Sequence, residues 1–254
     1  MIFILGGNGF VGSAFVSFCK KKNLKYSLIT KQNYSKYKNK KCDIFINAAQ
    51  NSSKLLPKKN PMSDFKKNVE LTKKSLIDFK FKHYILLSSC DVYPDCSSPL
   101  STSENHKINV SSQSTYGFHK YLSEQCVMQT ADKWLILRLG GMVGAGLKKN
   151  AIFDILNGNK LWISPKSQLQ FMNTGKVAEL TFSLVKKLKT NEIFNMCGEN
   201  LVTIKNFLRY SPKQVSVDVS ANQIKYNVNI RKIQKFVTIP DSRHSVIDFI
   251  KFYK

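Results

Sequence analysis

Short apolar runs alternate with amphipathic segments along the first two-thirds of the 254-residue chain. Runs such as Ile44–Ile46 and Ile85–Leu87 are apolar without interruption, which is typical of parallel strands buried on both faces of a sheet. The alternation predicts an α/β fold, a parallel sheet covered by helices. The predicted strands of this region are Ile2–Leu5, Tyr26–Thr30, Asp43–Asn47, His83–Ser88 and Trp134–Arg138, and the predicted helices are Phe10–Lys22, Asp64–Phe79 and Thr115–Thr130.

The segment between Thr30 and Cys42 is short, with only eleven residues, mostly Lys, Asn, Tyr and Ser. A doubly wound fold often places a further strand and helix there. We expect that unit to be trimmed or replaced by a loop.

The pattern changes to shorter elements from about Gly140. We predict a small C-terminal substrate lobe over residues 146–254, from which a strand near 192–195 returns to the main sheet formed by residues 1–145. The predicted helices of this part are Asn150–Asn157, Gly175–Leu188, Thr203–Tyr210, Asn229–Lys235 and Ser242–Phe252, and the predicted strands are Leu161–Ser164, Glu192–Asn195, Gln214–Val219 and Phe236–Ile239.

The net charge of +24 raises the question of an anionic partner. A strong positive field attracts nucleic acids, anionic surfaces and phosphate-bearing substrates. Arginine, which is favoured for bidentate phosphate recognition, occurs only four times, and the lysines are spread along the chain. We therefore keep RNA binding as an alternative only, although the field would help to collect a diphosphate-bearing substrate.

The six cysteines show no Cys-x-x-Cys spacing, and the four histidines lack the spacing of metal ligands. These patterns predict free thiols in a reducing cytoplasm and no metal site. No run of about 18 apolar residues occurs, so no membrane span is expected. The start Met1–Leu5 lacks a basic region and runs into glycines, which favours a buried strand over a secretion signal.

Three glycines follow the first predicted strand and precede the first predicted helix. In this context Gly6 permits a tight turn, Gly9 lets the backbone approach a pyrophosphate, and Gly12 lets the helix pack closely against the strand. The helix N-terminus then offers unpaired N–H groups to the phosphates. The turn predicts a Rossmann-type fold with a dinucleotide site, to which Asn8, Phe10 and Val11 also belong.

The second predicted strand ends at Thr30 and Lys31, where NAD-binding proteins place an acidic residue against the ribose hydroxyls. No Asp or Glu occurs between Met1 and Cys42. Lys31 could instead meet a 2′-phosphate, so we favour NADP over NAD. The alternative is that Lys31 faces solvent and selects neither cofactor.

Tyr116 and Lys120 open a predicted helix and are offset by only about 40° around it. Both side chains can therefore reach one pocket. A nearby ammonium favours tyrosinate and lowers a phenol pKa that is ordinarily about 10. Tyr116 could then exchange a proton with a reacting oxygen, while Lys120 bonds the nicotinamide ribose.

Ser89 follows the strand His83–Ser88, at the sheet edge where open α/β folds bind their ligands. Its hydroxyl could hold the reacting oxygen. A plain capping serine is the alternative.

In these residues the chain resembles the extended short-chain dehydrogenase/reductases, the NAD-dependent epimerase/dehydratase family that acts mainly on nucleotide sugars. The resemblance implies that Ser89, Tyr116 and Lys120 are catalytic. It also implies that Asn47-Ala48-Ala49 passes beside the cofactor. The matching stretches are Gly6–Gly12, Asn47–Ala49, Asn68-Val69, Ser88–Tyr93, Glu104, Tyr116–Lys120, Arg138-Leu139 and Phe171–Ala178.

Several positions depart from the family pattern. Cys90 and Asp91 stand where dehydratases carry an acid and a glutamate, so only a shorter carboxylate remains. Asp91 is either a base or a strand-end residue with local hydrogen bonds. Gly141 replaces a substrate-facing asparagine, and Asn173, which could bind substrate or cap a helix, stands where histidine is frequent. The resemblance places Ser89 and these four residues beside the substrate.

Together these features predict an NAD(P)-dependent enzyme that acts on a nucleotide-activated sugar. We favour keto-sugar reduction or 4-epimerisation over dehydration, because the dehydratase acid/base pair is weak. The resemblance also implies a homodimer formed through Asp64–Phe79 and Thr115–Thr130. The alternatives are a non-catalytic NADP-binding sensor and an RNA-binding protein on the same fold.

Overall fold

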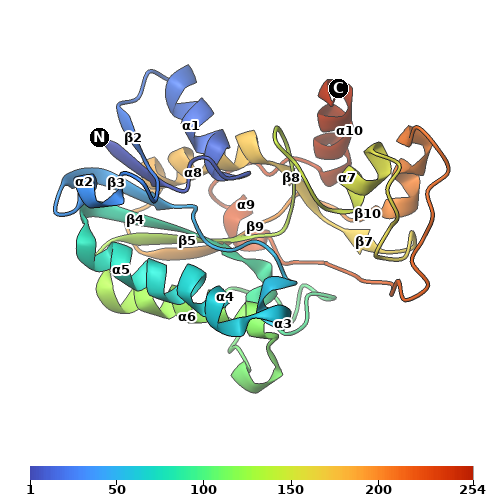
Figure 1. Ribbon diagram of the computed structural model, residues 1–254, viewed down its shortest axis with the longest axis horizontal. Helices are drawn as coiled ribbons and strands as arrows, with labels where there is room; N and C mark the ends of the chain where they lie inside the picture. Colours follow the sequence, from blue (N-terminus) through green and yellow to red (C-terminus); the bar gives the residue numbers. More distant parts are fainter. Residues whose placement is uncertain (254) are drawn as a thin grey trace.

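The computed structural model describes residues 1–253 and has one six-stranded parallel sheet at its centre. The sheet order is β2-β1-β3-β4-β5-β9 (Figure 1). The first strand lies next to the edge strand β2, and the later strands are added in chain order on its other side, ending with the edge strand β9. The strands are β1 (Ile2–Leu5), β2 (Tyr26–Ile29), β3 (Lys41–Asn47), β4 (Lys80–Ser89), β5 (Trp134–Leu139) and β9 (Glu192–Met196).

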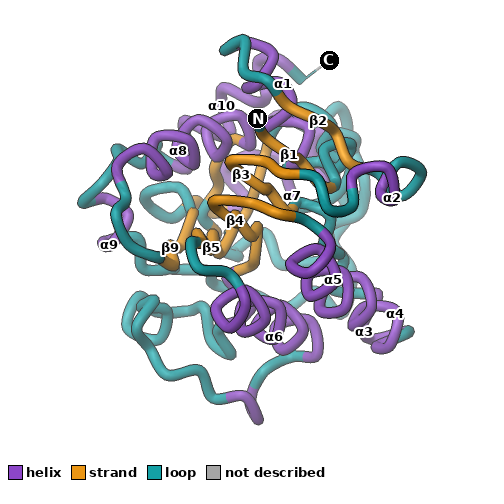
Figure 2. The backbone as a smooth tube through the Cα atoms, turned by 90° about the vertical axis from the view of Figure 1, so that its left-hand side faces the viewer, coloured by secondary structure: helices purple, strands orange, loops and turns teal. Residues whose placement is uncertain are grey.

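Helices cover both faces of this sheet, as expected for parallel strands that are apolar on both sides. On one face lie α1 (Gly12–Lys21) and α8 (Thr174–Lys187), joined by the stacked rings of Phe18 and Phe182 with centroids 4.9 Å apart. On the other lie α5 (Leu71–Asp78) and α6 (Thr115–Thr130), which bury Leu76 and Val127 (Figure 2). The predicted Rossmann-type α/β class is confirmed.

The predicted strands of the main sheet are all present, with ends shifted by a few residues. The short segment after β2 contains a single helical turn, α2 (Tyr34–Tyr37), and no strand, so the trimmed unit is also confirmed. The helix predicted for Asp64–Phe79 is divided into α4 (Pro61–Phe65), the π-helical turn η1 (Lys66–Glu70) and α5. It is preceded by α3 (Leu56–Lys59).

The chain beyond β5 builds a second, smaller cluster that lies beside the carboxyl ends of the strands (Figure 1). Its buried centre includes Ile152, Phe171 and Phe249. Its elements are β6 (Gly141–Val143), α7 (Ala151–Leu156), β7 (Gln168–Leu169), β8 (Phe171–Asn173), β10 (Val202–Thr203), the 3-10 helix η4 (Ile204–Tyr210) and α10 (Ser242–Phe252). The short helix α9 (Arg231–Gln234) packs instead beside β9, with Ile233 in the main core. Two further 3-10 turns, η2 (Cys90–Val92) and η3 (Val110–Ser112), flank the segment before α6.

Three predicted strands of this part were wrong. Leu161–Ser164 and Gln214–Val219 meet in one isolated bridge, Leu161 to Val217, and Phe236–Ile239 forms no strand. The strands that do form are the short pairs β6–β8 and β7–β10. Within residues 1–253, no helix is long and apolar enough to cross a bilayer.

Candidate active site

The glycine turn has the geometry that its sequence predicts. Gly6 has φ +81°, and a Cβ atom there would lie 2.6 Å from the Cα atom of Ala49. A Cβ atom on Gly12 would collide with the Gly6 carbonyl oxygen, whereas one on Gly9 would approach nothing closer than that oxygen at 3.2 Å. No side chain caps α1. The Ser13 and Ala14 N–H groups donate to the Gly9 and Val11 carbonyls, so the N–H groups that precede them in the turn are the ones that can meet an anion. The turn therefore fits a pyrophosphate.

The other residues of the turn differ in exposure. Asn8 is exposed, while Phe10 and Val11 are half-buried and pack against the main core. The two apolar side chains therefore hold the turn in place.

The end of β2 carries no carboxylate. The Thr30 N–H donates to Oδ1 of Asn33 at 2.7 Å, and the Asn33 amide donates to the Leu28 carbonyl at 2.9 Å. These bonds close the turn after the strand and leave Lys31 exposed. Lys31 is thus an exposed charged side chain at the end of β2, where the ribose is expected.

The end of β3 approaches the glycine turn through its backbone. The Asn47 side chain is fully buried and donates to the Tyr84 hydroxyl at 2.9 Å and to the Thr72 hydroxyl at 3.2 Å. The Asn47 side chain is therefore part of a buried hydrogen-bond network in the core. Ala48 and Ala49, which follow, bring the main chain against Gly6.

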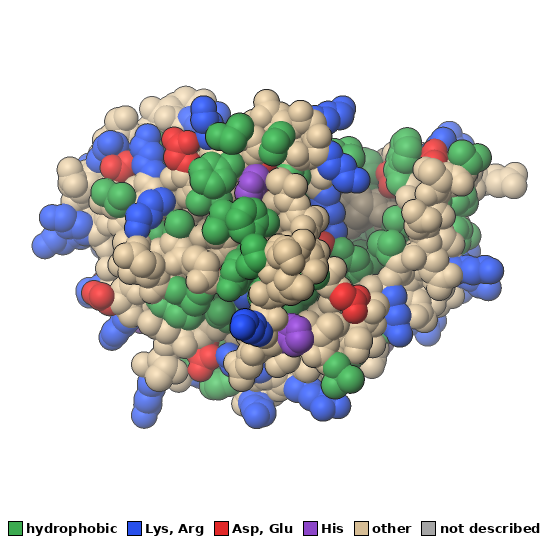
Figure 3. All heavy atoms as spheres, turned by 90° about the horizontal axis from the view of Figure 1, so that it is seen from below, with side chains coloured by type: hydrophobic (Ala, Val, Ile, Leu, Met, Phe, Trp, Pro, Cys, Tyr) green, Lys and Arg blue, Asp and Glu red, His purple; other side chains and the backbone are tan. Residues whose placement is uncertain are grey.

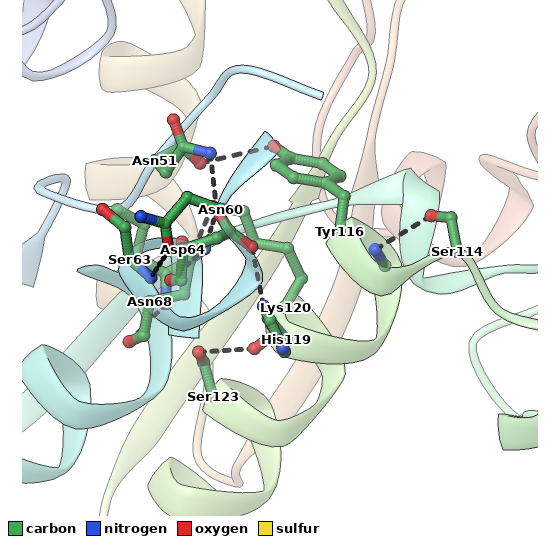
Figure 4. Close-up of polar contacts among 12 residues, drawn as sticks. Asn51, Asn60, Ser63, Asp64, Asn68, Ser114, Tyr116, His119, Lys120 and Ser123 are labelled. Carbon is green, nitrogen blue, oxygen red and sulfur yellow. Dashed lines mark hydrogen bonds and ion pairs between the residues drawn. The ribbon is translucent and has the colours of Figure 1, made fainter. Parts of the chain in front are cut away.

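Tyr116 and Lys120 lie on one side of α6, as their spacing predicts (Figure 4). Both are buried, with 6% and 3% of their surface exposed. The Tyr116 hydroxyl donates to the Asn51 carbonyl at 3.4 Å, and the Lys120 ammonium donates to Oε1 of Gln50 at 2.8 Å. That ammonium also lies 5.5 Å from the centroid of the Tyr116 ring. The two residues after Ala49 thus connect the glycine turn with the Tyr–Lys pair.

The pKa of Tyr116 moves against our expectation. Burial, followed by the negative charge of Asp91, raises the pKa of this phenol, and a hydrogen bond from Ser89 only partly opposes the rise. Burial also lowers the pKa of Lys120 to about 7, against the attraction of Asp64, Asp91 and Glu124. The expectation that the ammonium lowers the pKa of Tyr116 was therefore wrong for this structure, because Lys120 itself is desolvated and turned to Gln50.

Ser89 both caps a turn and faces the site. Its Oγ atom accepts from the Asp91 N–H at 3.2 Å and donates to Oδ2 of Asp91 at 3.0 Å. The other oxygen of Asp91 accepts from the Lys54 ammonium at 2.7 Å and from the Tyr226 hydroxyl at 2.6 Å. Gly117 lets α6 approach this turn, because a Cβ atom there would collide with the Asp91 carbonyl oxygen. Ser89 and Tyr116 are thereby brought together.

Cys90 does not face the site, which corrects its predicted role. Its thiol is buried, donates to the Arg138 carbonyl at 3.2 Å and lies 3.5 Å from the Cys197 sulfur. The chain leaves β4 after Ser89 and enters the 3-10 turn η2 at Cys90, and this turn directs the thiol toward Arg138 and Cys197 in the core.

Gly141 and Asn173 lie on the paired strands β6 and β8. Gly141 is half-buried, and a Cβ atom there would lie 2.5 Å from the carbonyl oxygen of Gln170, so the position has no room for a side chain. Oδ1 of Asn173 accepts from the Gly175 N–H at 2.8 Å and caps α8. The hydrogen bonds therefore show Asn173 in one of its two predicted roles, helix capping.

Buried polar contacts hold α6 in position. Arg138 of β5 meets Glu124 of α6 at 2.7 Å, and Ser88 donates to the same carboxylate at 2.6 Å. His119, which directly precedes Lys120, meets the buried Asp64 at 2.7 Å (Figure 4). These contacts fix α6 against β5 and α4. Within residues 1–253, no group of three His, Cys, Asp or Glu side chains could hold a metal ion.

The sequence reasoning missed the residues that touch the predicted ones. These are Gln50, Asn51, Lys54 and Tyr226. The first two directly follow Asn47-Ala48-Ala49, which was a usable signal. Nothing in the sequence connects the other two with the site.

The chain belongs to the NAD-dependent epimerase/dehydratase family, whose model matches residues 2–197. It is therefore an enzyme of the extended short-chain dehydrogenase/reductase type, as the resemblance implied. No curated protein matches the sequence closely enough to count as a relative.

Solved structures show the same fold at low sequence identity. MoeE5 in complex with UDP-glucose and NAD is 13% identical, with TM-score 0.82 over 99% of this chain and 97% of that one. A dTDP-4-dehydrorhamnose reductase from Clostridium acetobutylicum is 17% identical, with TM-score 0.79 over 99% and 98% of the two chains. The UDP-N-acetylglucosamine 4-epimerase from Methanobrevibacter ruminantium is 17% identical, with TM-score 0.77 over 99% and 97%.

Proposed function

We propose that the enzyme transfers hydride between NAD(P) and a nucleotide-activated sugar, by keto-sugar reduction or 4-epimerisation, with Tyr116 as the acid/base. The observation that carries this proposal is the convergence of Ser89, Tyr116 and Lys120 beside the segment that also packs on Gly6. Three proteins of the same fold support this class of substrate. MoeE5 is in complex with UDP-glucose and NAD, and the other two are a dTDP-4-dehydrorhamnose reductase and a UDP-N-acetylglucosamine 4-epimerase.

Tyr116 suits the reductive direction. Its raised pKa keeps the phenol protonated at neutral pH, which is the form that can donate to a carbonyl oxygen. Ser89 would accept a hydrogen bond from the reacting oxygen in its hydroxyl form, and Lys120 would exchange Gln50 for the ribose hydroxyls. The bound cofactor supplies or accepts the hydride. In 4-epimerisation Tyr116 would first take the proton as a phenolate and then return it as a phenol.

We propose that the sugar nucleotide lies between the main sheet and the C-terminal lobe. Figure 3 shows the surface hollowed between these two parts. Lys149 borders the same region, since its ammonium donates to the Ser52 carbonyl at 2.7 Å. With Lys148 it forms a positive edge that suits a diphosphate.

For the cofactor we favour NADP over NAD. The exposed ammonium of Lys31 follows β2, and no carboxylate precedes Cys42 to bind the ribose hydroxyls of NAD. Binding constants for NADPH and NADH, measured on wild type and on Lys31→Ala, test this preference. NADPH should bind more tightly to wild type, and the variant should lose that difference.

We also propose a homodimer through α5, α6 and the helical turns before them. Hydrophobic side chains gather on the face seen from below, which carries these helices (Figure 3). Ile77 is 67% exposed, and Phe65, Phe118 and Leu122 are half-buried. Light scattering should give twice the monomer mass for wild type and the monomer mass for Phe118→Glu.

The free cysteines fit our proposal of a reducing cytoplasm.

The reaction is tested by incubating the protein with NADPH or NADH and a panel of keto-sugar nucleotides, while absorbance at 340 nm is followed. Epimerisation is followed in parallel by chromatography of the sugar nucleotides. Turnover of at least one substrate is expected. Tight cofactor binding without any turnover would support the sensor alternative. RNA retention that falls steeply with salt would support the RNA-binding alternative.

A further inference from the structure

The carboxylate of Asp91 joins three separate parts of the chain. One oxygen accepts from Ser89 of the same turn at 3.0 Å. The other accepts from Tyr226 of the C-terminal lobe at 2.6 Å and from Lys54, in the segment after β3, at 2.7 Å. Asp91 thus fixes the direction of the Ser89 hydroxyl, and two distant side chains fix Asp91.

Tyr226 is the better anchored of the two distant partners. Its N–H donates to the Gln168 carbonyl at 2.8 Å, and the next N–H, that of Asn227, donates to the Cys96 carbonyl at 2.7 Å. The backbone on which the phenol is carried is therefore tied both to β7 and to the loop after Ser89. Lys54, by contrast, has 56% of its side chain exposed, so water and salt screen its charge.

The direction of the Ser89 hydroxyl matters for the proposed reaction. While the Ser89 proton is donated to Asp91, its remaining lone pair can accept a hydrogen bond from a substrate hydroxyl or from Tyr116. If no hydrogen bond holds the Asp91 carboxylate in place, the Ser89 hydroxyl is free to rotate away from that arrangement, because a serine side chain has three staggered rotamers.

We propose that Tyr226 is a positioning residue: its phenol holds Asp91 so that Asp91 keeps the Ser89 hydroxyl oriented beside Tyr116. This inference rests on the proposed function. It assigns to the C-terminal lobe a direct part in arranging the reacting groups, in addition to binding substrate.

The test is a double-mutant cycle with Tyr226→Phe and Ser89→Ala, measured as kcat and KM. Loss of one hydrogen bond to a charged group should lower kcat about tenfold in Tyr226→Phe, with KM changed less than about twofold. In the Ser89→Ala background, Tyr226→Phe should cause no further loss, because its effect passes through Ser89. Tyr253→Phe is the matched control, since its hydroxyl accepts from Asn157 at 2.8 Å in the same lobe.

Two kinetic results would overturn the inference: an unchanged kcat in Tyr226→Phe, or an equal loss with and without Ser89. A crystal structure of Tyr226→Phe tests it without turnover. The Ser89–Asp91 hydrogen bond should be lost there, and its retention would reject the role of Tyr226. If wild type turns over no sugar nucleotide, the proposed function fails, whereas the crystal structure still decides whether Tyr226 positions Ser89.

Discussion

Lys120 and Gln50 are joined by a hydrogen bond of 2.8 Å from the ammonium to Oε1 of the amide. The amide is itself held by the Thr72 hydroxyl at 3.0 Å. An ammonium has three N–H donors, and Gln50 occupies one of them. We expect the nicotinamide ribose to take over this donor when the cofactor binds, so the free energy of the exchange sets part of the affinity.

Replacing Gln50 by alanine should strengthen cofactor binding. The variant no longer offers a competing acceptor to Lys120, and a net hydrogen bond of about 1 kcal/mol corresponds to roughly fivefold in affinity. Fluorescence titration with NADPH and NADH measures the change. Gln129→Ala is the control, because its Oε1 atom also accepts from a lysine, Lys73, at 2.8 Å on the surface. Equal or weaker binding by Gln50→Ala would contradict the exchange.

Gly9→Ala should fold normally and bind the cofactor poorly. The new methyl group meets only the Gly6 carbonyl oxygen, at 3.2 Å, but it stands where the backbone approaches the pyrophosphate. We expect the dissociation constant to rise at least tenfold, about 1.4 kcal/mol, with little change in melting temperature. Gly175→Ala is matched sterically, with its nearest contact at 3.1 Å, and should bind as wild type does. Unchanged binding by Gly9→Ala would remove the turn from the cofactor site.

The stability of the cofactor-free protein should depend on pH through Lys120. Its pKa is lowered from 10.5 to about 7 by burial. Between these values the unfolded chain binds more protons than the native one, so native stability rises with pH from about 7 upward and the cost of burying the charge is largest below 7. Lys120→Met removes this term. The melting temperature of Lys120→Met minus that of wild type should therefore be larger at pH 6 than at pH 9. An equal difference at the two pH values would show that Lys120 is not desolvated.

Glu124→Gln should destabilise the protein strongly. It leaves the buried Arg138 without its carboxylate partner, which costs about 3 kcal/mol or more. Urea denaturation measures the loss. Asp248→Asn breaks a surface pair with Lys251 in which both side chains are 64% exposed, and should change stability by less than about 0.5 kcal/mol. Similar values for the two variants would refute the supporting role of the Arg138–Glu124 pair.

The sequence predicted what depends on local patterns. The bounds of α6, Thr115–Thr130, were predicted correctly. In the structure Ser114 caps this helix, since its Oγ atom accepts from the Gly117 N–H at 3.1 Å. The strands of the main sheet followed from uninterrupted apolar runs. The same rule failed at Phe236–Ile239, where an apolar run packs into the core without pairing.

The contacts around the site depend on distant partners and could not be predicted. Tyr226 and Asp91 are separated by 135 positions, and Lys54 and Tyr226 by 172. The short strand β6 begins with a glycine and has three residues, so it carries no period that a sequence pattern could reveal. Burial, which sets the pKa of Tyr116, is likewise a property of the packed structure.

The most direct measurement of the central claim is the turnover of Tyr116→Phe in the presence of saturating cofactor. The variant keeps the ring and loses only the hydroxyl that transfers the proton. The account predicts that kcat falls by about 10²- to 10⁴-fold while the dissociation constant of the cofactor stays within about twofold of wild type. A Tyr116→Phe enzyme that retains the wild-type kcat would contradict it.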